Sequence, residues 1–168
     1  RNIRSVPGLS VVRVDGDGDY RDDALNGEEG DRVVQDDCDW EMSPEYTSAQ
    51  PWDFNFRYEA ILAAESGGLQ EQASRTFDSW LEESRGEFEE IEDEGEEDIS
   101  DRGYILYGDK GEGVWSMVAL VQVRSATYQV TMEGVADQEG GIPRRAFDNE
   151  LRKLTDYLKI TFGSQIPE

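Results

Sequence analysis

The segment of residues 52–60 constrains the fold more than any other part of the chain, because it alternates aromatic and polar residues without interruption. A period of two is typical of a β-strand with one buried face and one solvated face. The aromatic side of this alternation consists of Trp52, Phe54, Phe56 and Tyr58. These side chains could line an apolar pocket, but a strand's buried face is the default for such a pattern, so we predict a core strand.

In two other segments the apolar residues recur with the 3.6-residue period of an α-helix. Leu69, Ala73, Phe77, Trp80 and Leu81 form one apolar stripe and predict an amphipathic helix that ends near Gly86. The second helix is predicted from residue 146 to residue 159, after a proline that suits a first helical turn. Its stripe consists of Ala146, Phe147, Leu151, Leu154, Tyr157 and Leu158.

Short strands are predicted at residues 9–14 and 32–35, and residues 104–107, 114–124 and 128–132 read as a β-meander. Residues 117–121 lack polar alternation, which indicates a central strand covered on both faces. The glycine-rich segment 108–113 reads as a hairpin turn, since it lacks the Gly-Lys-Ser/Thr end of a phosphate-binding loop. We therefore predict a single α+β domain over residues 1–168, with a mainly antiparallel sheet packed by two amphipathic helices.

The charge of the chain limits its possible functions. It has 39 Asp and Glu against 16 Lys and Arg, no His, and a formal net charge of −23. Catalysis through Ser-His or Cys-His pairs and zinc sites with His ligands are excluded, because the required imidazole is missing. Binding of naked nucleic acid or an anionic bilayer is disfavoured, since both require a basic surface. The predicted partners are a basic protein or cations, and no apolar run reaches the roughly 18 residues of a membrane span.

Two acidic stretches, residues 15–31 and 87–98, are predicted as loops, and the second could instead be an edge strand. In the first stretch, Asp15, Asp17 and Asp19 alternate as the first ligands of a calcium loop do, and Asp23 could add a fourth oxygen ligand. The pattern lacks the glycine and the closing glutamate of an EF-hand. A solvated Asp/Gly loop is therefore the competing interpretation.

Cys38 is flanked by Asp residues, whose negative charge opposes thiolate formation, so we interpret it as a small buried residue beside Trp40. A carboxylate pair for glycoside hydrolysis stays open, because any fold of so acidic a chain brings some acids close together.

The order of elements resembles a known group. Cys38-Asp39-Trp40, the acidic stretch Gly95-Glu96-Glu97-Asp98 before an aromatic strand, the hairpin of residues 114–132 and the helix of residues 147–158 are the features concerned. Over residues 33–162 the chain resembles the actinobacterial secreted lipoprotein domains of unknown function, whose folds are similar to the PsbP-like α/β/α sandwich. The resemblance implies a binding or accessory domain exposed at the cell envelope, without established catalysis. Those domains typically pair the cysteine of the Cys-x-Trp motif with an earlier cysteine, whereas this sequence contains no cysteine other than Cys38.

Three classes of function remain. The first is a non-enzymatic extracytoplasmic binding or accessory domain whose acidic face serves solubility and cation capture. The second is an inhibitor that imitates nucleic acid and occupies a basic groove, which requires carboxylates in ordered rows. The third is an enzyme that uses carboxylates alone. We predict the first class, with no enzymatic activity and no resident cofactor other than the Ca²⁺ considered above.

Overall fold

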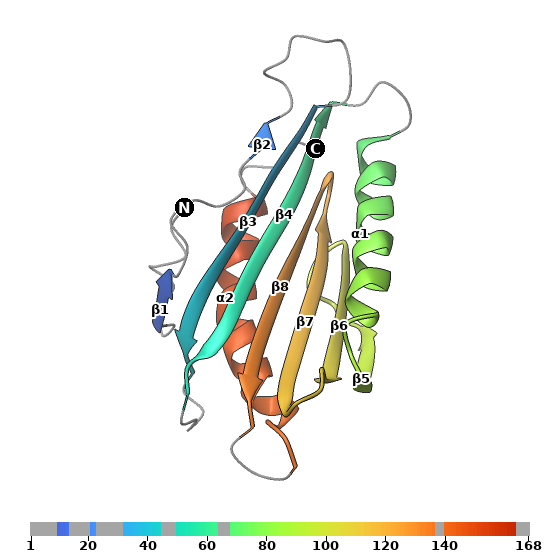
Figure 1. Ribbon diagram of the computed structural model, residues 1–168. Coiled ribbons are helices and arrows are strands. Elements are labelled where there is room, and N and C mark those ends of the chain that lie inside the picture. The colour runs from blue at the N-terminus through green and yellow to red at the C-terminus, as the bar shows by residue number, and fades with distance from the viewer. Residues whose placement is uncertain are drawn as a thin grey trace.

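In the part of the chain that the structure describes, the protein combines one antiparallel sheet with two helices (Figure 1). The structure is a computed structural model that describes residues 10–13, 21–22, 32–44, 50–63, 68–136 and 140–163. The helices are α1 (Leu69–Arg85) and α2 (Arg144–Gly163). The strands in these residues are β1 (Ser10–Arg13), β2 (Arg21–Asp22), β3 (Arg32–Ser43), β4 (Trp52–Ala63), β5 (Glu90–Glu96), β6 (Arg102–Asp109), β7 (Val114–Val123) and β8 (Ala126–Val135).

The strands lie in the order β1-β3-β4-β8-β7-β6-β5, and β2 pairs with β3 beside β1. Each of these pairs is antiparallel. The predicted α+β class with a mainly antiparallel sheet is therefore confirmed. The three strands of the predicted meander lie side by side, and β4 joins them through β8.

The β7 strand is the centre of the core, as the absence of polar alternation predicts, and it is buried from residue 115 to residue 122. Successive side chains of a strand point to opposite faces. Met117 accordingly belongs to the cluster that contains Phe147 of α2, whereas Val118 belongs to the cluster that contains Phe77 of α1. The two helices therefore contribute to the cores on opposite faces of the sheet.

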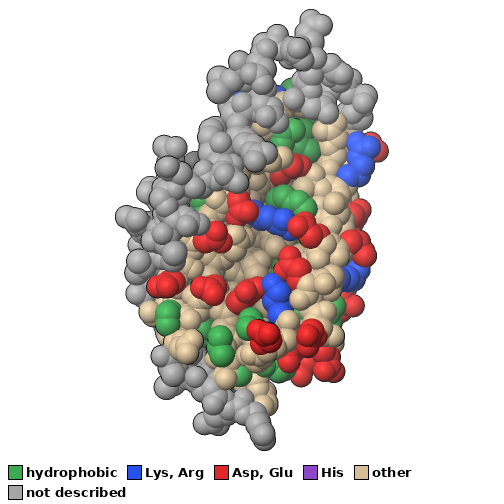
Figure 2. All heavy atoms as spheres, in the orientation of Figure 1, with side chains coloured by type: hydrophobic (Ala, Val, Ile, Leu, Met, Phe, Trp, Pro, Cys, Tyr) green, Lys and Arg blue, Asp and Glu red, His purple; other side chains and the backbone are tan. Residues whose placement is uncertain are grey.

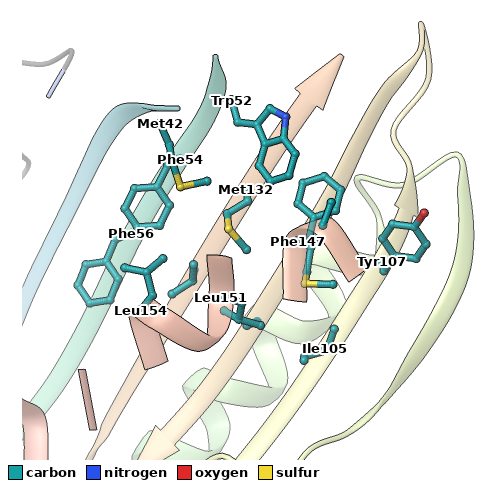
Figure 3. Packing of buried hydrophobic residues seen from close by; sticks show 14 of the residues in the cluster. Met42, Trp52, Phe54, Phe56, Ile105, Tyr107, Met132, Phe147, Leu151 and Leu154 are labelled. Carbon is teal, nitrogen blue, oxygen red and sulfur yellow. The ribbon is translucent and has the colours of Figure 1, made fainter. Parts of the chain in front are cut away.

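The aromatic face of β4 lies in the core, as predicted. Trp52, Phe54 and Phe56 are all buried, and the Trp52 ring lies 4.4 Å from the Phe147 ring between centroids. Figure 3 shows these aromatic side chains together with Phe147 and Leu154 of α2. The alternation in the sequence thus identified the face correctly.

Two acidic segments form strands. β3 extends to Ser43, beyond the predicted residues 32–35, because it pairs with β4 along its length and its apolar residues face the core. Residues 90–96 form β5 at one edge of the sheet, which is the edge-strand alternative and not an acidic loop. An edge position lets the carboxylates of β5 reach water while its backbone pairs with β6.

Candidate functional site

The face of the sheet that bears α1 is partly covered: α1 packs against β4, β7 and β8, and it leaves an uncovered half around β3 and the adjoining ends of β4 and β8. Figure 1 shows α1 beside this half, with α2 behind the sheet. Cross-strand partners point to the same face of a sheet. The register places side chains on this face in three rows: Asp37, Arg57 and Gln129; Asp39, Asn55 and Thr131; and Glu41, Asp53 and Glu133.

A hollow of about 370 Å³ lies on this uncovered half. Figure 2 shows Asp and Glu side chains gathered across the face around it, with a few Lys and Arg side chains among them. A volume of this size lies within the usual range of small-ligand sites, about 300–1,000 Å³. The lining residues are Asp37, Asp39, Trp40, Asp53, Phe54, Asn55, Arg57, Glu87, Gln129, Thr131 and Glu133. We call this surface the acidic hollow.

Asn55 holds two carboxylates of the acidic hollow in place. Its Nδ2 donates to Oδ1 of Asp37 at 2.6 Å and to Oδ1 of Asp39 at 2.8 Å. The second oxygen of each carboxylate stays available as an acceptor for a further donor. The two negative charges are therefore oriented by the sheet and do not move as independent surface side chains.

Lys110 partly offsets the negative charge at the opposite end of the acidic hollow. Its Nζ lies 2.7 Å from Glu87 Oε2 and 2.5 Å from Glu133 Oε1. Burial lowers the pKa of Lys110, but the hydrogen bonds to Glu133 and Glu87 outweigh burial and raise this pKa above its ordinary value. Lys110 therefore keeps its charge and compensates these two glutamates.

Arg57 crosses the floor of the acidic hollow. Its Nε and Nη2 donate to Gln129 Oε1 at 3.2 Å and 2.8 Å, and Nη2 also forms an ion pair with Glu83 at 3.0 Å. The guanidinium lies over the Trp80 ring, 4.3 Å from its centroid. These contacts tie β4 to β8 and to α1 and fix the floor of the hollow.

The compensation of charge in the acidic hollow is uneven. In the described part of the chain, Asp37, Asp39 and Asp53 have no Lys or Arg within salt-bridge distance, whereas Glu87 and Glu133 share Lys110. Asp37, Asp39 and Asp53 are exposed to solvent. The β3 side of the acidic hollow therefore presents three uncompensated negative charges to an incoming molecule.

The predicted calcium ligands Asp15, Asp17, Asp19 and Asp23 lie outside the described residues, so that site stays a prediction. Among the described residues, no group of three or more Cys, Asp or Glu side chains is arranged to hold a metal ion. The predicted hairpin between β6 and β7 is present, with its turn at residues 110–113, because residues 108 and 109 still belong to β6.

Cys38 is half-buried rather than buried, although it packs against the core cluster as predicted for a structural residue. Its Sγ lies 3.7 Å from Asp36 Oδ1.

Sequence reasoning missed the acidic hollow, although a signal was present. Along β3 the apolar residues Cys38, Trp40 and Met42 alternate with the acidic residues Asp37, Asp39 and Glu41. This period of two is the pattern that identified β4. The predicted strand ended at residue 35, so this alternation was not used to extend it.

No helix of the described chain is both long and apolar enough to cross a membrane. Comparison with protein families, with curated proteins and with solved structures found no match to this chain.

Proposed function

We propose that the protein is a non-enzymatic, extracytoplasmic or cell-envelope-associated binding or accessory domain that docks a basic protein on the acidic hollow. The observation that supports this proposal is the set of uncompensated carboxylates of Asp37, Asp39 and Asp53 on one uncovered sheet face. Such a surface attracts a positively charged partner and gives the encounter a preferred orientation.

A sheet is a suitable support for such a surface, because the strand backbones fix the spacing of the side chains. Asp37, Asp39 and Glu41 occupy alternate positions of β3, so neighbouring carboxylates on this face are separated by roughly 7 Å along the strand. We further infer that the two amphipathic helices act as packed covers that keep the sheet rigid. Preorganised charges lose little freedom when a partner binds.

The same spacing favours a second candidate function, an inhibitor that imitates nucleic acid. Such an inhibitor needs carboxylates in ordered rows, and β3 and β5 both place acidic residues on strands. In this case the partner would be the nucleic-acid-binding groove of a basic protein. Both functions use negative charge to bind a basic surface, and they differ in the class of partner.

The first experiment is a titration of the protein with an octalysine peptide, at an ionic strength of about 0.1 M, where the Debye length is about 10 Å. In the variant Asp37→Asn/Asp39→Asn/Asp53→Asn, we expect the affinity to fall at least about tenfold, because three charge interactions of roughly 1 kcal/mol each in water are removed. Calorimetry gives the dissociation constants.

The matched control removes three negative charges at the far edge of the sheet, in the variant Glu92→Gln/Glu96→Gln/Asp98→Asn. Three strands separate β5 from β4, a distance of roughly 19 Å across the sheet. We expect this control to change the affinity by less than about threefold, because charges beyond a Debye length are largely screened. Equal losses in the two variants would show that net charge alone attracts the peptide, and would contradict the proposed site.

A further inference from the structure

The hydrogen-bonding groups of the acidic hollow are unevenly divided between donors and acceptors. The Asn55 amide uses its N–H groups on Asp37 and Asp39, and the Gln129 amide donates to Thr131 Oγ1 at 3.0 Å. The carboxylates have acceptor capacity alone, and the only N–H that remains on these two amides is one on Gln129. The acidic hollow therefore suits a ligand that brings several N–H donors.

The floor of the acidic hollow is shielded from water. Gln129 and Thr131 are 5% and 8% exposed, although both line the hollow. Ser116, the cross-strand neighbour of Glu133 on the same face, is fully buried, and its hydroxyl has no hydrogen-bond partner among the described residues. Polar groups in such surroundings interact more strongly with a well-placed partner than exposed surface groups do.

The protein already binds one guanidinium group at this place. Arg57 donates twice to Gln129, forms an ion pair with Glu83 and stacks on Trp80, and its side chain is 20% exposed. The acceptors on the β3 side, Asp37 and Asp39, have no comparable cation among the described residues. A second guanidinium on the β3 side would donate to oriented carboxylates, whereas Arg57 donates to the amide oxygen of Gln129.

We propose that the acidic hollow recognises an arginine side chain of the basic partner, with the guanidinium bound by the carboxylates of Asp37 and Asp39 that Asn55 orients. This inference rests on the proposed function and names the group that is recognised. Arginine fits better than lysine, because guanidinium presents five donors in a rigid plane, whereas an ammonium is a compact and strongly hydrated charge. Oriented carboxylates form the strongest hydrogen bonds with a planar group that can bridge them.

The test compares two hexapeptides of equal charge, one alternating glycine with arginine and the other alternating glycine with lysine. We expect the arginine peptide to bind the protein about fivefold more tightly or better, the factor that one additional net hydrogen bond provides. Asn55→Ala keeps the charge of the site but releases both carboxylates, so this variant should bind the two peptides with nearly equal affinity. Circular dichroism melts verify that it folds.

A second variant, Asp39→Asn, leaves Asn55 in place and should also reduce the preference for arginine. The matched control Glu92→Gln should retain the full preference. Equal affinities of the original protein for both peptides would overturn arginine recognition and leave the docking of basic proteins intact. If neither peptide binds, both proposals fail.

Discussion

Replacing Phe147 by alanine is expected to destabilise the protein by about 3–5 kcal/mol, the usual loss for a buried phenylalanine. Phe147 is fully buried and its ring lies 4.4 Å from that of Trp52 and 6.2 Å from that of Tyr107, between centroids. Figure 3 shows it projecting from α2 beside the aromatic residues of the sheet. The midpoint of thermal unfolding should fall by about 10 °C, since 1 kcal/mol corresponds to roughly 2–4 °C in a chain of this size.

The matched control is Asn149→Ala, an exposed position on the same helix. We expect it to change the free energy of unfolding by less than about 0.5 kcal/mol, as surface substitutions usually do. The comparison tests whether α2 is a packed cover of the sheet. If Phe147→Ala proved as mild as Asn149→Ala, the inferred packing of α2 would be wrong.

Replacing Gly108 by alanine is expected to destabilise the protein by about 2 kcal/mol, within the usual range for forcing an extra group into a packed interior. A Cβ atom at Gly108 would lie 2.1 Å from the Glu90 carbonyl oxygen and 2.9 Å from the Ile91 Cα, both on β5. These are backbone atoms, so the clash is relieved by moving β5 away from β6. Denaturant unfolding measures the loss.

Gly95 supplies a closely matched control for Gly108, because it lies on β5 and a Cβ there would meet no atom within 4 Å. Gly95→Ala should be neutral or stabilise the protein by up to about 1 kcal/mol, since glycine in a strand loses more conformational freedom than alanine. Similar losses in the two variants would show that β5 does not approach β6 as closely as the structure places it.

Much of the fold could be predicted because its signals are local. The alternation in β4 and the stripe of α1 each occupy one continuous segment, and a period of two or 3.6 reveals which side chains share a face. The unbroken apolar run of β7 likewise predicted burial on both faces. In these elements, residues close to one another in the sequence determine the local structure. Their secondary structure could therefore be predicted without knowledge of distant residues.

The acidic hollow could not be predicted in the same way, because it depends on register between distant strands. Asp37 and Gln129 share a row through Arg57, although 92 positions separate them in the sequence. A shift of one residue in either pairing would move every side chain of a strand to the opposite face. The sequence alone does not determine this long-range register, even where each strand is recognised.

The length of β3 illustrates a related limit. Asp is unfavourable in strands, so the predicted strand stopped at residue 35, before the acidic residues of β3. Pairing with β4 on one side and with β1 on the other supplies the hydrogen bonds that overcome this preference. Burial of Trp40 and Met42 adds a further stabilising contribution that local propensities do not include.

The most direct test of the central proposal is to map the bound peptide on the isotope-labelled protein by NMR. During titration with the arginine-containing hexapeptide, we expect the largest amide shift changes at residues 37–41, 53–57 and 129–133, where the three strands surround the acidic hollow. Residues 90–98 should change little, despite their many carboxylates. Shift changes centred on residues 90–98 or 15–31 would contradict the proposal that the uncovered sheet face is the binding surface.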